Sequence, residues 1–344
     1  MPKYLFLLLF IVTSSLIAQS QDLYMPRNVK QAYKKGTRSM DGMPGKNYWQ
    51  NYARYNITIT ALPPDRNIKG TETITYINNS PDVINSPVIK LFLNIHKPGA
   101  PREVGVSDDY LTSGIIIDAC SADGQFYNVH NNIFTNISIQ LPKPLQPQDS
   151  VHFSFDWHYE ISLQSNREGM IDSTTYFLAY FYPRVAVYDD NSGWDVMPFV
   201  DTHEFYSDFN DYAVKLNVPK NYIVWGTGTL QHPETLLQPT FLKRFNESLT
   251  SDETVRIVTK EDLKSQNVTI QNEINSWQFK ATNIPDMAFG ISDHYVWDGC
   301  SAVVDDATKR RASAQAAYND KAADYHYVAQ FARHSIDWLS HHWP

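Results

Sequence analysis

The sequence predicts a mainly β protein built around a large antiparallel saddle or sandwich. Apolar side chains alternate with polar ones over many short segments, which is the period of a half-buried strand. Pro, Asn, Asp and Gly separate these segments, as residues of tight turns do. Hydrophobic residues make up 42% of the 344 residues and aromatic residues 13%, which supplies enough apolar surface for a core.

The first strand is expected from residue 52 to 61, because every second residue from Tyr55 to Ala61 is apolar. The Thr- and Ile-rich residues 68–77 are expected to form its hairpin partner, since a Pro-Pro-Asp turn lies between the two segments. Shorter, mostly apolar runs at residues 88–93 and 114–118 predict buried strands.

Residues 151–161 give the clearest strand signal. Apolar residues occupy every second position: Val151, Phe153, Phe155, Trp157, Tyr159 and Ile161. A helix would scatter these residues around its circumference, whereas a strand places them on one face. The same alternation predicts a strand at residues 212–218, and further strands are expected at 255–259 and 277–281.

The pattern changes near residue 306, because residues 306–343 contain no Pro or Gly. Apolar residues there recur at three- and four-residue steps, which is typical of an amphipathic helix: Tyr325, Val328, Ala332, Ile336 and Leu339. We therefore expect a domain boundary within residues 302–306. Residues 48–305 form the β-rich domain in this prediction, and it should fold without residues 306–344.

The N-terminus predicts export. Lys3 precedes a short apolar run, and the small residues Ala18 and Ser20 follow it, which is the pattern of a secretory signal peptide over residues 1–20. Residues 21–47 are polar and contain Pro and Gly, so we expect a flexible lead-in. Periplasmic and extracellular destinations both remain open. No later apolar run reaches the length of a transmembrane helix.

The formal net charge of -8 argues against a nucleic-acid-binding protein, which normally carries a basic face. Cys120 and Cys300 are the only cysteines. Two cysteines make no disulfide framework, and whether they pair stays open. The oligomeric state is also left open.

Residues 179–199 read AYFYPRVAVYDDNSGWDVMPF, and residues 204–230 read EFYSDFNDYAVKLNVPKNYIVWGTGTL. Residues 286–298 read DMAFGISDHYVWD, and the C-terminal helix pattern follows them. These three matches (residues 179–230, residues 286–298 and the C-terminal helix), in this order, resemble bacterial members of the aminopeptidase N family of zinc metallopeptidases. The second match is similar to the last strands before the catalytic domain of that family, and the helix is similar to the first helix of its thermolysin-like domain.

The resemblance implies the N-terminal part of a secreted enzyme that removes N-terminal residues from peptides. In that family an HExxH helix and a later Glu hold the zinc ion, and the first Glu activates the bound water. The 344 residues contain no HExxH. We therefore expect no catalytic residue, no metal ligand and no activity in this chain alone, with Zn²⁺ bound in the missing catalytic domain. The alternative is a non-catalytic secreted β-domain that binds peptides or proteins.

Two features come nearest to a site. His203-Glu204-Phe205-Tyr206-Ser207 imitates a zinc motif, but Ser stands where the second His is needed, so a zinc site is not predicted. Phe177 and Tyr180 fall near the position where relatives carry a Gln or Glu that holds the substrate amine. Neither side chain has a carboxylate. They are candidates for lining a substrate pocket, with core packing as the competing interpretation.

Overall fold

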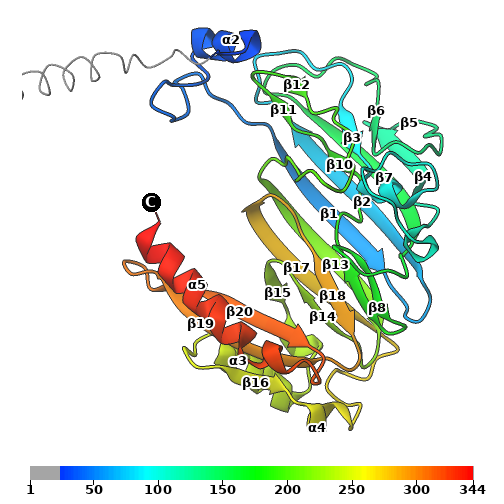
Figure 1. Cartoon of the computed structure of the whole chain (residues 1–344), viewed down its shortest axis with the longest axis vertical. Helices are drawn as coiled ribbons and strands as arrows, with labels where there is room; N and C mark the ends of the chain where they lie inside the picture. Colours follow the sequence, from blue (N-terminus) through cyan, green and yellow to red (C-terminus); the bar gives the residue numbers. More distant parts are fainter. Residues whose placement is uncertain (1–23, 344) are drawn as a thin grey trace, which may run out of the picture. The chain divides into compact units, whose positions relative to one another are not determined.

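The computed structural model describes residues 24–343, so the predicted signal peptide lies outside the described residues. The chain is mainly β, with several separate sheets (Figure 1). It divides into two compact units, of which the smaller comprises residues 24–49 with 190–193 among those described. The larger unit comprises the rest of the described chain. Each unit is considered by itself below.

The smaller unit contains helix α2 (Arg27–Lys35), which the prediction of a flexible lead-in did not anticipate. Lys34 and Lys35 occupy the last turn, where cations suit the helix dipole, and Gly36 follows in the left-handed conformation with φ 74°. Arg38 then forms an ion pair of 2.9 Å with Asp190 in the same unit. Local stop signals for a helix were therefore present in the sequence.

The main sheet has the strand order β15-β17-β13-β1-β2-β7-β4-β5. Its strands are β1 (Tyr52–Thr60), β2 (Asn67–Ile77), β4 (Ile115–Ala122), β5 (Gln125–Phe126), β7 (Ser150–Glu160), β13 (Asn210–Pro219), β15 (Thr229–Gln231) and β17 (Ile274–Ile284). Neighbouring strands are antiparallel except β1 and β13, which run parallel. The predicted hairpin of β1 and β2 and the predicted strand β7 are confirmed.

The alternation in the sequence separates the two faces of this sheet. The burial pattern of β7 switches at every residue, and Trp157 on its inner side is 1% exposed. Gly70 on the adjacent β2 lies flat against this indole, because a Cβ at that position would come within 2.1 Å of the Trp157 ring. The inner face therefore packs closely, and the polar outer face is left to solvent.

Two smaller sheets pack around the same core. One has the order β10 (Arg184–Val185), β3 (Val88–Lys90), β6 (Asn136–Ser138). The other has the order β14 (Ile223–Gly226), β18 (Phe289–Ser292), β9 (Thr175–Leu178), β8 (Gly169–Asp172). The strand expected at residues 88–93 is shorter, because the chain turns into the 3₁₀ helix η1 (Phe92–His96).

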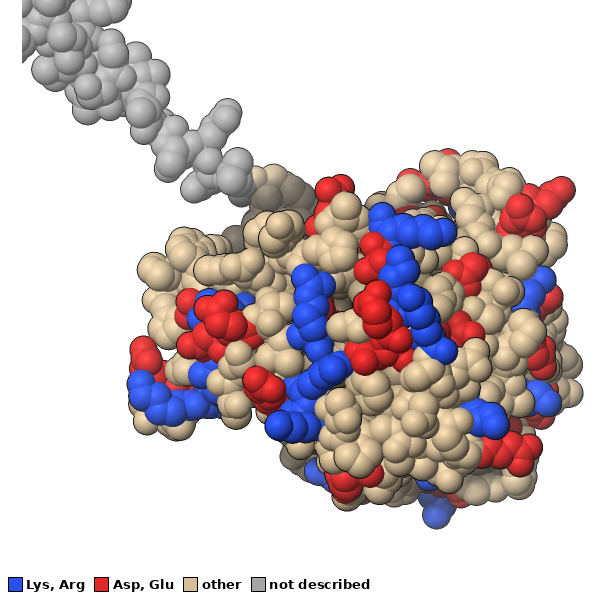
Figure 2. Space-filling model, turned by 90° about the horizontal axis from the view of Figure 1, so that it is seen from below, with Lys and Arg blue, Asp and Glu red and all other residues tan. Residues whose placement is uncertain are grey.

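The remaining elements are short. They are β11 (Tyr188–Asp189), β12 (Gly193–Trp194), η2 (Asp108–Tyr110), η3 (Pro233–Thr235), α3 (Pro239–Ser248) and α4 (Lys260–Leu263). Cys120 and Cys300 are both buried and free. Figure 2 shows Lys and Arg interspersed with Asp and Glu on the face seen from below.

The boundary expected at residues 302–306 is wrong. A three-stranded sheet of β16 (Val255–Val258), β19 (Val296–Asp305) and β20 (Arg310–Tyr318) runs through it, with β19 and β20 paired as an antiparallel hairpin. The helical pattern is confirmed only later, in η4 (Ala323–Tyr327) and α5 (Val328–His342).

Helix α5 lies along β19 and β20 and buries part of its surface there (Figure 1). Val328, Ala332 and Ile336 pack against the sheet, as the predicted stripe requires. Phe331 and Leu339 from the same predicted stripe are 61% and 50% exposed. The helix is therefore a cover for the β19–β20 hairpin, with a second apolar face turned outward.

A chain ending at residue 306 is now expected to lose the ordered β16–β19–β20 sheet. Deleting β20 and α5 uncovers Val296 and Cys300 and removes the hydrogen-bonding partner of β19. Hydrogen exchange should show faster exchange at residues 296–305 than in the full chain, and light scattering should detect self-association. A monomer with unchanged protection of β19 would restore the boundary at 306. A chain ending at residue 319 serves as the control, because it keeps the hairpin.

Candidate functional site

Tyr180 occupies an unusual backbone position. It follows β9 by two residues and has φ 60°, in the left-handed region that residues other than Gly rarely adopt. This conformation costs about 1–2 kcal/mol, so contacts of the Tyr180 side chain must hold it. The residue is therefore fixed by its surroundings and projects from a strained turn.

Those surroundings form an aromatic cluster of four rings, namely Tyr180, Phe92, Phe199 and Phe205. The centroid of the Tyr180 ring lies 4.2 Å from that of Phe205 and 6.2 Å from that of Phe199. Phe92 from η1 meets Phe205 edge-on at 4.7 Å. Such edge-to-face and offset contacts add to the area that the rings bury, so the cluster is a rigid apolar surface.

A charged pair borders the aromatic cluster. Arg167 donates to both carboxylate oxygens of Glu204, over 3.1 Å and 2.7 Å. Burial raises the pKa of the Tyr180 hydroxyl, and the nearby Arg167 guanidinium opposes that shift. The hydrogen bonds from Arg167 lower the pKa of Glu204. Because Glu204 is already paired with a cation, it is poorly placed to bind a substrate amine as well.

His96 forms a buried pair with Glu168, the residue that follows Arg167. His96 Nε2 lies 2.9 Å from Glu168 Oε1, and both side chains are 5% exposed. The other ring nitrogen of His96 lies 2.9 Å from the carbonyl oxygen of Tyr110. Each ring nitrogen of His96 thus lies within hydrogen-bond distance of an oxygen atom, and an N–H on either nitrogen can donate to it. The pair anchors η1 to the segment that carries Arg167.

The structure separates the two residues that the sequence analysis grouped. Phe177 lies within β9, opposite Gly290 of β18 and Gly169 of β8, and is half-buried. Tyr180 belongs to the aromatic cluster, which among the described residues does not include Phe177. Sequence reasoning missed Arg167, and it weighed Glu204 only as part of a failed zinc motif. No local pattern connects Arg167 with Glu204, because the pair forms across 37 residues of chain.

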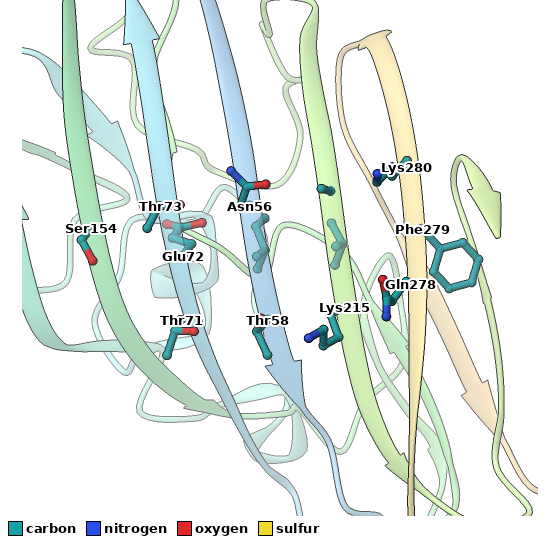
Figure 3. Close-up of a pocket in the computed structure, with 13 residues that line it drawn as sticks. Asn56, Thr58, Thr71, Glu72, Thr73, Ser154, Lys215, Gln278, Phe279 and Lys280 are labelled. Atoms are coloured by element: carbon teal, nitrogen blue, oxygen red, sulfur yellow. The ribbon is translucent and has the colours of Figure 1, made fainter. Parts of the chain in front are cut away.

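A second hollow lies on the outer face of the main sheet. Figure 3 shows its polar lining, and its volume is about 360 Å³. Thr58, Thr71, Lys215 and Gln278 line it from four adjacent strands. Glu72 also borders the hollow, but its side chain is buried on the other side of the sheet. The hollow contains no pair of carboxylates or nucleophile–base pair, so it offers no evident chemistry.

The described residues do not fit a zinc ion. Among residues 24–343 no group of three or more His, Cys, Asp or Glu side chains could hold a metal. His203 lies 3.7 Å from Glu103, while Glu204 is bound to Arg167. The segment around them has neither helical nor strand structure, and Ser207 stands where the second His of a zinc motif would be, so His203 has no second ligand at the motif spacing. No helix in the described part is long and apolar enough to cross a membrane.

Comparison with known proteins adds the following. No protein-family model matches the chain, and no curated protein sequence does. Among solved structures it is similar to the M1 zinc metallopeptidase of Deinococcus radiodurans, with 12% identity and a TM-score of 0.44 over 81% of this chain. One such structure is a mutant bound to a Tyr-Ser-Ala substrate. A two-domain M1 zinc metallopeptidase mutant bound to L-tryptophan has 11% identity and a TM-score of 0.40 over 75% of this chain.

The chain spans about half the length of these structures, covering 50%, 49% and 46% of them. The structural neighbours are thus zinc metallopeptidases of the aminopeptidase N type, at low similarity.

Proposed function

We propose that this chain is the β-rich N-terminal portion of an exported zinc aminopeptidase and contributes an aromatic wall to its peptide-binding cleft. The zinc ion and the residues that act on its water belong to a catalytic domain that is not among these 344 residues. Helix α5 is proposed as the first helix of that domain. The chain alone then has no peptidase activity.

One observation carries this proposal: the first two matches of the resemblance meet in one cluster, named here the Arg184 cluster. Arg184 from the first match forms an ion pair of 2.5 Å with Asp286 from the second. Tyr182 donates a hydrogen bond of 2.8 Å to the same carboxylate and lies 3.2 Å from the hydroxyl of Tyr212, which also belongs to the first match. A buried Arg184 with a half-buried Asp286 as its counterion needs specific partners, so two matches that converge on this pair support a common origin.

The substrate role rests on Tyr180 and its neighbours. An exposed ion pair of Arg167 and Glu204 beside packed aromatic rings suits a peptide side chain better than a free amine. Tyr180 is therefore proposed as part of a specificity pocket, and Phe177 as a residue that supports β9 behind it. The amine anchor that relatives place here would have to come from another residue.

The rival function is a secreted binding module that uses the same aromatic surface for peptides or proteins without catalysis. The two proposals can be distinguished by using antibodies against this chain to capture the natural protein from the cells that produce it. The aminopeptidase proposal expects them to capture a longer exported protein that lacks residues 1–20, contains about one zinc ion per molecule and loses activity on chelation. Capture of a metal-free protein of this length, without activity, would support the binding module.

The purified chain itself provides the control. Metal analysis of residues 21–344 should find no stoichiometric zinc, and peptide p-nitroanilides should remain intact. Tightly held zinc with activity lost on chelation would mean that the ligands lie within this chain after all.

A further inference from the structure

A pocket to which the proposed function gives no role lies beside the turn at residues 227–228, which joins β14 to β15. Its volume is about 520 Å³, and β14, β15, α3 and β20 contribute to its walls. Gly228 in the turn has φ 94°, and a Cβ there would come within 2.6 Å of the Lys280 carbonyl oxygen. The turn therefore requires glycine. Pockets of about 300–1,000 Å³ are the usual size for small-molecule sites.

Four aromatic residues stand among those that line this Trp225 pocket, namely Trp225, Phe245, Phe279 and Trp297. Trp225 and Trp297 meet nearly at right angles, with ring centroids 6.1 Å apart. Phe245 of α3 packs against Trp297 with a centroid distance of 5.4 Å. Trp297 and Phe245 are buried and hold the half-buried Trp225 in place, so Trp225 is the ring of these three that a ligand with an aromatic or branched apolar group can lie against.

Two hydrogen-bond donors in the pocket lining are buried and unused. Trp225 Nε1 and Gln315 Nε2 have no hydrogen-bond partner in the described part of the chain. The Gln315 amide is held in one orientation, since its Oε1 accepts a bond of 2.6 Å from Trp297 Nε1. A buried donor without an acceptor costs about 1–3 kcal/mol. An acceptor that reaches either nitrogen would remove that cost.

The charged residues that line the pocket also favour a ligand with an anionic hydrogen-bond acceptor. The lining includes Arg310 and Arg311 and contains no Asp or Glu. Arg311 is already bound to Ser301 and Asp252. The Arg310 side chain is exposed, and its charge adds to the hydrogen bonds from Thr308 in lowering the pKa of Asp305, which lies opposite Arg310 in the β19–β20 hairpin. In a chain with net charge -8, a pocket that combines hydrogen-bond donors with a cation at its rim favours an anionic group.

We propose that the Trp225 pocket binds a carboxylate attached to an aromatic body. The ring would lie against Trp225, while the carboxylate accepts from Arg310 and from the unused donors. A free arylalkyl acid and the C-terminus of a peptide that ends in Phe share this chemistry. The site requires no zinc and no catalytic residue, so it stands or fails separately from the proposed aminopeptidase function.

Isothermal titration calorimetry on the purified chain tests this proposal with two matched pairs of probes. The free-acid pair is 3-phenylpropionate and 3-phenylpropionamide, and the peptide pair is N-acetyl-Gly-Phe and its C-terminal amide. We expect at least one acid to bind, at least about tenfold more tightly than its amide, because only the acid makes charge-assisted hydrogen bonds. The pair that responds identifies the source. Equal binding of acid and amide in both pairs, or no heat from any probe at millimolar concentration, would overturn the proposal.

Two substitutions that each remove one positive charge test where the acid binds. Arg310→Gln should weaken acid binding about tenfold and leave amide binding unchanged, since it removes the cation at the rim. Lys243→Gln is the matched control, because Lys243 is exposed on α3 and does not line this pocket. Circular dichroism should show both variants folded, as both residues lie on the surface. Equal effects of the two substitutions would place the acid elsewhere and contradict the proposal.

Discussion

Asp286→Asn is expected to lower the free energy of unfolding by about 3–5 kcal/mol, because it leaves the Arg184 charge buried without its counterion. Arg184 is only 2% exposed, and its guanidinium packs over the rings of Phe92 and Tyr182. The substitution preserves the shape of the side chain, so packing changes little. Urea unfolding followed by tryptophan fluorescence measures the difference.

Glu204→Gln is the matched control, since it makes the same chemical change in an ion pair at the surface. The Glu204 side chain is 76% exposed, and its partner Arg167 is 37% exposed. Exposed pairs contribute at most about 1 kcal/mol, so this variant should unfold close to the wild type. Similar small losses in both variants would mean that the Arg184 cluster does not hold residues 179–230 and 286–298 together.

Glu72→Met is expected to stabilise the protein at pH 8 by about 1–3 kcal/mol, the usual cost of a buried polar group without a partner. Glu72 points from β2 into the core, is 2% exposed, and neither carboxylate oxygen has a hydrogen-bond partner among the described residues. Burial raises its pKa well above the ordinary value, with the Arg184 charge acting weakly against that shift. Methionine has a similar shape and needs no hydrogen bond.

The effect should depend on pH with a definite sign. The folded chain keeps the Glu72 proton at a pH where the unfolded chain has released it, so folding binds a proton. The contribution of Glu72 to stability is therefore greatest below the ordinary pKa of glutamate and is lost as the pH rises from there through the raised pKa. The advantage of Glu72→Met should grow from pH 5 to pH 8 in urea titrations.

Glu160→Met provides the comparison, because Glu160 belongs to the same sheet and its side chain is 47% exposed. It should show no gain at either pH. A wild type whose stability does not fall over this range, together with a destabilised Glu72→Met, would indicate that the carboxylate has a partner in solution.

The strands of the main sheet could be predicted because each has one buried face. In β1, β7 and β13 apolar residues occupy nearly every second position, and the structure buries these same positions, whereas in β2 Glu72 occupies one of the buried positions. Which strands are neighbours could not be predicted in the same way. The parallel pairing of β1 with β13 joins segments separated by about 150 residues, and no local pattern records it.

Strand β20 shows how residue composition misleads. Residues 306–318 lack Pro and Gly and are rich in Ala and Arg, which favours a helix on intrinsic propensity. Pairing with β19 overrides that preference, and α5 covers the face formed by Ala314, Ala316 and Tyr318. The spacing of these three residues by two was the available sign of a strand.

The candidate site was harder to predict than the fold. The sequence indicated Tyr180 through the resemblance, and the structure places that residue in a strained turn within an aromatic cluster. Phe92, Phe199 and Arg167 come from separate segments, so only the folded chain brings them to Tyr180. Sites assembled from loops generally leave no single motif in the sequence.

The central claim is that this chain is the β portion of a zinc aminopeptidase, and sequencing the messenger RNA past the codon for Pro344 tests it most directly. The claim predicts an in-frame continuation that encodes HExxH on a helix, followed by a further Glu as the third zinc ligand. A stop codon directly after Pro344 in the natural transcript would contradict it. The aromatic cluster around Tyr180 would then belong to a secreted binding module without peptidase activity.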